Sequence, residues 1–346
     1  MATFPGRPVE TRPLRGGDAA AGSCITPPMM PDLAIDISGL TKTYGKGPKA
    51  KQALKGIDLQ VPRGAFFGLL GPNGAGKSTM INILAGLVIK TGGDARIWDW
   101  DITKNPREAK RSIGVVPQEL NIDPFFTPRE AMELQAGLYG VPRKARRTDE
   151  ILAAVGLSDQ ADTYARRLSG GMRRRLLVAK AMVHSPPVIV LDEPTAGVDV
   201  ELRRSFWAYI RTLNQAGVTI LLTTHYLEEA ERFCDEIAII NHGELIVRDT
   251  PAGLKRRLDS KILMLRTEER IDALPETLQG LDAKVTPNGR LQIRYRPSEA
   301  QVDEVLARIR AAGLTIADLS TTEGDLEDIF VALTSDRPTP PAEAAE

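Results

Sequence analysis

A short glycine-rich segment has the residue types and the spacing that phosphate groups require. Residues 71–78 read GPNGAGKS, in which glycines let successive backbone amides point into one concavity because no Cβ stands in the way. Lys77 supplies a compact positive charge for the outer phosphates, and the Ser78 hydroxyl suits a magnesium ion. An apolar run at 65–70 predicts a strand before the segment, and apolar residues at helical spacing up to 87 predict a helix after it, whose positive end faces phosphate. The residues expected to bind phosphate are Gly71, Pro72, Asn73, Gly74, Ala75, Gly76, Lys77, Ser78 and Thr79.

Two acidic residues end an apolar run further along the chain. The run at 188–191 reads VIVL and is followed by Asp192 and Glu193. As a strand, it places both carboxylates at the carboxyl edge of a sheet, where nucleotide sites form in α/β folds. Asp192 suits magnesium, directly or through water, and Glu193 suits a general base that polarises an attacking water. Acids after a strand also cap helices, so the chemical interpretation depends on the glycine-rich segment upstream.

The composition is that of an ordinary globular protein. The chain has 346 residues, enough for two or three structural units, with 42% hydrophobic and 26% charged residues. Its 45 basic and 45 acidic residues give a formal net charge of zero, so we expect no nucleic-acid partner. The two cysteines, Cys24 and Cys234, are too few for a disulfide framework or a four-ligand zinc site, which favours a reducing compartment.

No segment has the pattern of a secretory signal or a membrane span. Residues 1–23 lack the apolar core that a signal peptide needs. The longest apolar runs, such as 188–191 and 218–222, are far shorter than the roughly 20 residues of a transmembrane helix. We therefore expect the chain to lie on the aqueous side of any membrane.

Strand and helix patterns divide the chain into parts. Residues 1–31 are rich in Pro, Gly, Ala and Arg and predict a flexible tail. Residues 32–250 predict one domain in which strands alternate with helices, so that its sheet is largely parallel and covered. A helical block at about 119–183, periodic over 129–138 and 149–155, lies beside that sheet as an insertion. The predicted strands are 33–37, 57–61, 65–70, 188–191, 219–222 and 237–240.

A second pattern begins at residue 251. Residues 251–335 predict a small α+β accessory domain, and residues 336–346 predict a second flexible tail. The predicted elements of the accessory domain are a strand at 261–266, a hairpin at 284–295 with the turn Pro287-Asn288-Gly289, and amphipathic segments at 298–312 and 325–333.

A third motif lies in the helical block. Residues 168–172 read LSGGM, and alone they describe an ordinary serine-capped helix start. In order with the other motifs, they make the chain from about Leu33 to Thr250 resemble the ATP-binding subunit of ABC transporters. The motifs that carry the resemblance are Gly71–Ser78, Gln118, Leu168–Met172, Asp192-Glu193, Asp199 and His225. The resemblance implies an α/β fold, the P-loop NTPase core of an ABC ATPase, with an antiparallel β part, a helical insertion and a small C-terminal α+β domain.

The resemblance also implies a head-to-tail dimer that holds two ATP molecules between its subunits. In the family, the turn that matches Ser169, Gly170 and Gly171 closes on the ATP held by the other subunit, again as a helix N-terminus facing phosphate. Asp199 matches the acid that links the two ATP sites, although simple helix capping is a close alternative. ATP and Mg²⁺ are therefore the expected ligands, and a second copy of the chain is an expected partner.

Three more residues match functional positions of the family. Tyr44 matches the aromatic residue that stacks on adenine; the alternative is a tyrosine at a strand edge. Gln118 matches the glutamine that touches magnesium and reports the nucleotide state to the membrane subunit; the alternative is a polar loop residue. His225 follows a predicted strand and matches the histidine that contacts the γ-phosphate. The resemblance thus gives catalytic roles to Glu193, His225 and Gln118, and magnesium to Ser78, Gln118 and Asp192.

Details of the motifs are similar to one branch of the family. The third motif ends in Met172 where the family most often has Gln, and Arg173-Arg174-Arg175 follow. This form, the segment 192–204 and the ending 325–333 resemble the drug-resistance and nodulation-type exporter ATPases, the type-2 exporter branch. Because the serine and both glycines are intact, we expect ATP-driven closure to be retained. The arginine run has an alternative interpretation as a solvated helix face.

We therefore expect an ATP-binding and ATP-hydrolysing subunit of a membrane exporter. Its expected partner is an integral-membrane permease of the type-2 exporter kind, contacted through Gln118 and residues 121–130, at the cytoplasmic face of the plasma (inner) membrane. An importer ATPase is one alternative. A soluble ABC ATPase acting on ribosomes or chromosomes fits less well, because only one phosphate loop is present and a compact insertion separates Lys77 from Asp192. A P-loop NTPase outside the ABC family is disfavoured by the serine–glycine turn and by the histidine.

Overall fold

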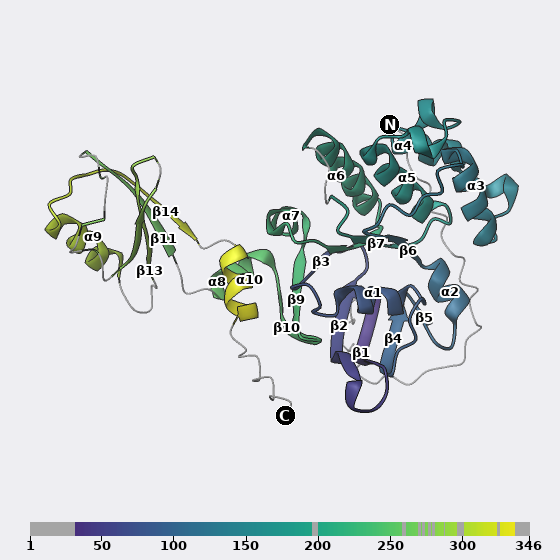
Figure 1. Ribbon diagram of the computed structural model, residues 1–346, viewed down its shortest axis with the longest axis horizontal. Coiled ribbons are helices and arrows are strands. Elements are labelled where there is room, and N and C mark those ends of the chain that lie inside the picture. Colours follow the sequence, from purple (N-terminus) through teal and green to yellow (C-terminus); the bar gives the residue numbers. More distant parts are fainter. Residues whose placement is uncertain are drawn as a thin grey trace, which may run out of the picture. The chain divides into compact units, whose positions relative to one another are not determined.

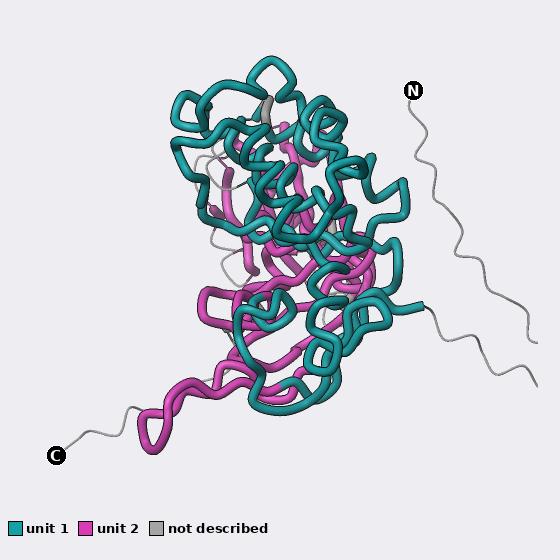
Figure 2. Tube along the Cα trace, turned by 90° about the vertical axis from the view of Figure 1, so that its right-hand side faces the viewer, with its two compact units in different colours: residues 1–40, 58–65, 82–221 teal, residues 41–57, 66–81, 222–346 magenta. Residues whose placement is uncertain are grey.

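A computed structural model describes most of the chain. It covers residues 32–195, 200–257, 261–268, 271, 274–275, 278, 281–286, 288–295, 301–323 and 326–335. The expectations for the tails at 1–31 and 336–346, for Asp199, for Pro287 and for residues 298–300 and 325 lie outside the described residues. The chain divides into two compact units, coloured separately in Figure 2. Unit 1 comprises 1–40, 58–65 and 82–221, and unit 2 comprises 41–57, 66–81 and 222–346.

Unit 1 contains the parallel strand pair that carries the predicted acids. β6 (Ile113–Val116) and β7 (Val188–Asp192) pair in parallel, with Val116 opposite Leu191, and β8 (Thr219–Thr223) neighbours β7. Residues 188–191 are all buried, as an uninterrupted apolar run predicts for a strand covered on both faces.

A second sheet lies largely in unit 1 and includes the antiparallel part of the fold. Its strand order is β2-β1-β4-β5, and β4 and β5 pair antiparallel. Its strands are β1 (Leu33–Tyr44), β2 (Lys51–Pro62), β4 (Gly92–Ile97) and β5 (Trp100–Asp101). The strands predicted at 33–37 and 57–61 are confirmed and extend further, because hydrogen bonds to neighbouring strands continue beyond the apolar alternation.

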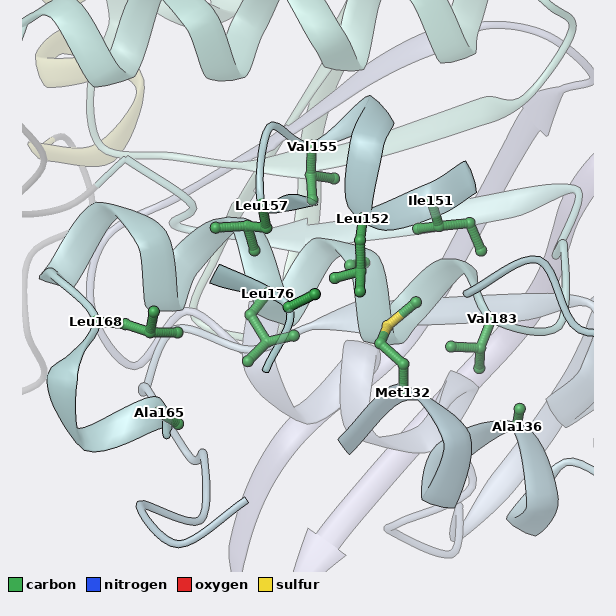
Figure 3. Close-up of a cluster of buried hydrophobic side chains, with 12 residues drawn as sticks. Met132, Ala136, Ile151, Leu152, Val155, Leu157, Ala165, Leu168, Leu176 and Val183 are labelled. Carbon is green, nitrogen blue, oxygen red and sulfur yellow. The ribbon is translucent and has the colours of Figure 1, made fainter. Parts of the chain in front are cut away.

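The helical block of unit 1 is built around a shared apolar core. Its helices are α3 (Pro128–Leu138), α4 (Thr148–Ala154) and α5 (Gly170–Met182), and α2 (Pro106–Arg111) and α6 (Val200–Gln215) also belong to unit 1. A capping box starts α3: the Thr127 Oγ1 accepts from the Glu130 amide over 3.2 Å, and the Glu130 Oε2 accepts from the Thr127 amide over 2.9 Å. Figure 3 shows that Met132, Leu152 and Leu176 come from the three helices and point into one cluster, so α5 is anchored to its neighbours.

Unit 2 contains the strand and helix that flank the glycine-rich segment. β3 (Phe66–Leu70) pairs in parallel with β9 (Glu236–Asn241), and β9 pairs antiparallel with β10 (Glu244–Asp249). All five residues of β3 are buried. α1 (Lys77–Leu84) begins inside the glycine-rich segment, and α7 (Leu227–Phe233) and α8 (Pro251–Arg257) follow later in the chain. The predicted order of strand, glycine-rich loop and helix is confirmed.

The accessory region of unit 2 is a four-stranded antiparallel sheet covered by a helix. The strand order is β12-β13-β11-β14, and α9 (Val302–Ala311) covers one face, where Val305 and Ile309 join the buried cluster (Figure 1). The strands are β11 (Lys261–Thr267), β12 (Asp282–Val285), β13 (Leu291–Tyr295) and β14 (Ile316–Glu323). The strand at 261–266 and the hairpin are confirmed, whereas β14 has no sequence signal beyond Ile316 and Leu319, because its pairing with β11 rather than its apolar pattern makes it a strand.

The last helix, α10 (Leu326–Ser335), returns from that sheet to earlier elements of unit 2. It packs against α8 and α7. The Asn241 Nδ2 at the end of β9 donates to the Thr334 carbonyl over 3.1 Å, and the Arg294 Nη2 of β13 donates to the Asp328 Oδ1 over 2.8 Å. Helix α10 therefore links the accessory sheet to β9. None of the helices in the described ranges is both long enough and apolar enough to cross a bilayer.

Candidate functional site

Close backbone packing requires glycine at two positions of the phosphate loop. A Cβ on Gly71 would lie 2.2 Å from the Ile240 carbonyl oxygen. Gly76 has φ +111°, and a Cβ there would lie 2.8 Å from the Ala53 carbonyl oxygen. Both distances are shorter than real Cβ contacts, so any larger residue displaces the backbone of the loop. By contrast, a Cβ on Gly74 would meet no atom within 4 Å, so the tip of the loop leaves space around its backbone.

Lys77 is held over this loop. The residue is only 8% exposed, and its Nζ donates to the Gly71 carbonyl over 2.5 Å and to the Pro72 carbonyl over 3.2 Å. The ammonium thus lies at the start of α1 above the backbone that the glycines shape, where the helix end adds partial positive charge. Ser78 is exposed. This part of unit 2 has the donors that a phosphate chain requires.

The turn between β9 and β10 supports the phosphate loop, and sequence reasoning missed it. The Gly243 amide donates to the Ala75 carbonyl over 2.9 Å, and the Lys55 amide donates to the Gly243 carbonyl over 2.9 Å. Gly243 has φ +79°, and a Cβ there would lie 2.6 Å from the Ala53 carbonyl oxygen. The only local signal is an Asn-His-Gly turn, which does not indicate what the turn contacts.

Tyr44 and His225 are both exposed residues of unit 2. Tyr44 ends β1 with 41% of its surface exposed, and the Lys42 Nζ lies 4.8 Å from its ring centroid. An exposed ring is available for stacking on a base. His225 follows β8, and its ring centroid lies 4.1 Å from that of Tyr226. The Thr224 Oγ1 accepts from the Tyr226 amide over 3.0 Å, so the turn that presents His225 is closed by a side chain.

In unit 1 the structure brings two of the predicted residues into contact. The Gln118 Nε2 donates to the Glu193 Oε2 over 2.8 Å. Gln118 follows β6 and Glu193 follows β7, so the parallel pairing of these strands accounts for their proximity. Asp192, partly buried, is the last residue of β7. Glu193 has φ +45°, a left-handed conformation that is unusual for glutamate and is often found at functional sites.

The serine–glycine turn caps a helix and leaves its end open. Ser169 is the N-cap of α5, and its Oγ accepts from the Met172 amide over 3.2 Å. Ser169 and Gly170 are exposed, and a Cβ on Gly170 would meet no atom within 4 Å. The N-terminus of α5 is therefore capped by serine and accessible from outside this unit.

One interpretation of the arginine run after this turn was a solvated helix face. The structure shows that this interpretation does not hold for Arg174. Arg174 is 5% exposed, and its Nη1 donates to the Pro117 carbonyl over 3.0 Å and to the Gln118 carbonyl over 2.8 Å. Burial lowers the pKa of Arg174. The Arg175 Nη1 donates to the carbonyls of Val155 and Gly156 over 3.1 and 3.3 Å, at the end of α4. The sequence offered no signal for either contact, because three consecutive arginines look alike in an exposed or a buried setting.

The predicted magnesium ligands have the chemistry that magnesium prefers. Ser78 offers a hydroxyl, Asp192 a carboxylate and Gln118 an amide oxygen, all hard oxygen donors. Among the described residues no group of three or more His, Cys, Asp or Glu side chains is placed to hold a metal. Each of these donors suits magnesium, which with nucleotides takes further ligands from phosphate oxygens and water.

Known proteins match these features. The family model described as ABC transporter matches residues 54–196. The chain is 38% identical to the daunorubicin/doxorubicin resistance ATP-binding protein DrrA of Streptomyces peucetius, over 88% of this chain and 93% of that protein. It is 34% identical to the Nod factor export ATP-binding protein I of Ralstonia nicotianae, over 87% of this chain and 93% of that protein.

A solved structure agrees with these relatives. The ATP-binding cassette MJ0796, in a dimeric post-hydrolysis state with ADP and Pi, superposes with a TM-score of 0.56 at 29% identity, over 62% of this chain and 98% of that one. The fold is thus that of an ABC ATPase. The chain belongs to the ABC transporter family, as an ATP-binding and ATP-hydrolysing subunit of its exporter branch.

Proposed function

We propose that this chain drives export through a separate membrane permease of the type-2 exporter kind, as a head-to-tail dimer at the cytoplasmic face of the membrane. The contact between Gln118 and Glu193 carries the mechanistic part of this proposal, because it joins a residue of the permease-facing loop to the expected base. The DrrA and Nod factor export relatives are named as resistance and export ATP-binding proteins, which supports the direction of transport.

The roles of the residues follow from their chemistry. The loop at 71–79 cradles the phosphates with its amides, and Lys77 neutralises the charge of the outer ones. Ser78, Asp192 and Gln118 would hold Mg²⁺, which would neutralise negative charge on the phosphates. Glu193 accepts the proton of the attacking water, and His225 donates to the γ-phosphate. Tyr44 stacks on the adenine.

The second copy of the chain completes the arrangement. In the proposed dimer, the N-terminus of α5 with Ser169, Gly170 and Gly171 faces the ATP held by the partner. Closure of the dimer requires ATP in both subunits, and ATP hydrolysis allows the dimer to open again. ATP therefore shifts the dimer between open and closed states by its different affinity for the two.

The segment after Gln118 is the proposed contact with the permease. Phe125 is 69% exposed and Leu120 38% exposed, and apolar side chains in such exposed positions are typical of protein contacts. Phe126, next to Phe125, is also exposed. An opening or closing of the dimer that moves Gln118 therefore moves this surface with it.

A photo-crosslinking experiment tests the proposal. A photoreactive amino acid at Phe125 should crosslink to a type-2 exporter permease when the two are co-expressed, and the chain should then sediment with membranes. The same probe at Val331, which is exposed on α10, is the matched control. Equal crosslinking at the two positions, or a chain that stays in the soluble fraction with the permease present, would contradict the proposed partner.

A further inference from the structure

We propose that Arg174 is a positioning residue that ties helix α5 to Gln118, and through Gln118 to Glu193. The inference rests on the proposed function, because it assumes that Gln118 and Glu193 act on ATP. It adds a series of contacts within one subunit that connects the serine–glycine end of α5 to the expected base, Glu193. All three residues lie in unit 1.

The contacts of Arg174 are specific to the backbone of the Gln118 loop. One nitrogen, Nη1, donates to two successive carbonyls, those of Pro117 and Gln118, over 3.0 and 2.8 Å. Strand β6 ends at Val116, so these two carbonyls lie beyond the strand ladder. The Arg174 guanidinium therefore donates to two backbone carbonyls that have no partner strand at this point among the described residues.

The burial of Arg174 argues against a merely incidental contact. The residue is 5% exposed, and no carboxylate among the described residues pairs with it. A buried charge without a countercharge is costly, and an apolar residue of similar size fills such a space at lower cost. The geometry therefore points to a requirement for the two donated hydrogen bonds.

Helix α5 is suited to transmit displacement. Arg174 lies five residues after Ser169, about 7.5 Å along the helix axis. Leu176 and Ala179 of the same helix lie in the apolar cluster of the helical block, and Figure 3 shows Leu176 among the side chains of that cluster. Because the cluster is closely packed, we expect a displacement of the helix to be shared with the block. A shift of α5 when Ser169 engages phosphate thus shifts the Gln118 backbone, and the Gln118 side chain carries the shift to Glu193.

The next residue supplies a matched control. Arg175 lies on the same helix, and its Nη1 also donates to two successive carbonyls, those of Val155 and Gly156. These carbonyls end α4 rather than the Gln118 loop. Arg174→Met and Arg175→Met therefore remove the same kind of contact from two different segments.

Amide hydrogen exchange tests the anchoring directly. We expect Arg174→Met to speed exchange over residues 117–122, whereas Arg175→Met speeds it over 155–157 and leaves 117–122 unchanged. Arg174→Lys, which keeps a donor, should protect 117–122 in part, and it replaces the methionine variant if that variant fails to fold. Unchanged exchange over 117–122 in a folded Arg174 variant would overturn the inference.

A double-mutant cycle tests the route to catalysis. We expect Arg174→Met to lower the kcat of ATP hydrolysis by about 10- to 100-fold, with KM for ATP within about twofold, because a positioned base is displaced. In a Gln118→Ala background the same change should have little further effect, because the route is already broken. An equal loss of kcat in both backgrounds would overturn the route through Gln118. If Gln118→Ala alone leaves kcat unchanged, the proposed role of Gln118 fails instead, and the exchange experiment still decides the anchoring.

Discussion

The side chains of Gln118 and Glu193, 75 residues apart in the chain, meet through a hydrogen bond of 2.8 Å from Nε2 to Oε2. The parallel pairing of β6 with β7 brings the two residues to the same end of neighbouring strands. Glu193 also has φ +45°, a conformation that costs a non-glycine residue about 1–3 kcal/mol. The Glu193 carboxylate is therefore held by the Gln118 amide, and the Glu193 backbone has a strained conformation.

Replacing Glu193 by glutamine should stop turnover without stopping closure. The change keeps the shape of the side chain and removes the negative charge that draws a proton from water. We expect ATP hydrolysis, measured by phosphate release, to fall by at least about 100-fold. An ATP-dependent dimer should accumulate on size-exclusion chromatography with light scattering. Glu119→Gln, an exposed change nearby, is the control, and a Glu193 variant that turns over at the original rate would contradict the role as base.

Lys77→Ala should weaken nucleotide binding. The ammonium is held over the loop by two carbonyls, so its loss removes a positive charge already in place for phosphate. We expect Kd for a fluorescent ATP analogue to rise by at least about 10-fold, since charge-assisted contacts contribute about 1.5–3 kcal/mol each. Lys55→Ala removes the same charge from a partly exposed pair with Glu244 and should change Kd little. Equal effects of the two variants would indicate a nonspecific charge effect.

Gly71→Ala should destabilise the fold more than an alanine at an open glycine. The new Cβ would meet the Ile240 carbonyl oxygen at 2.2 Å, so β9 or the loop must shift. Gly47→Ala is the comparison: Gly47 has φ +69° but no atom lies within 4 Å of the new Cβ, which limits its cost to about 1–2 kcal/mol of backbone strain. Thermal unfolding should show a larger drop in Tm for Gly71→Ala. A similar drop in both variants would show that the contact with Ile240 relaxes freely.

Two changes at Ser169 should separate helix capping from phosphate binding. Ser169→Ala removes the acceptor for the Met172 amide and should lower stability by about 1 kcal/mol. Ser169→Asp keeps a capping oxygen but adds a negative charge to a helix end that is proposed to face phosphate. We expect the aspartate variant to keep its Tm and to lose the ATP-dependent dimer. An aspartate variant that dimerises normally with ATP would contradict the proposed contact.

The stability contributed by Glu133 should depend on pH below about 4.5. Hydrogen bonds from Thr148, and next from Arg146, lower the pKa of the Glu133 carboxyl. Because the folded pKa lies below the unfolded one, the stabilisation is present above the unfolded pKa, near 4.5, and is lost as the pH falls through the folded pKa. Glu133→Gln should therefore lower Tm at pH 7 and have a smaller effect at pH 3. A difference in Tm that does not change with pH would assign the effect to packing.

Much of the fold could be predicted because its signals are local. Buried strands such as Val188–Asp192 appear as apolar runs, and α3 and α4 appear as residues with helical periodicity. Strand β14 could not be found in this way, since most of its residues are polar and its paired residues in β11 lie 49 to 62 positions earlier in the chain. The return of α10 to α7 and α8 has no local signal either, because an amphipathic helix does not specify the surface that it covers.

By itself, the sequence determined the phosphate loop, the acids at the end of β7 and the serine cap of α5, because each depends on neighbouring residues in a short motif. Only the tertiary structure decided that Gln118 contacts Glu193 and that Arg174 is buried against the carbonyls of the Gln118 loop. The physical reason is that strand pairing and helix packing, not spacing along the chain, set which polar groups meet. Three consecutive arginines have the same sequence pattern whether they are exposed or buried. Only the fold shows which of them is buried.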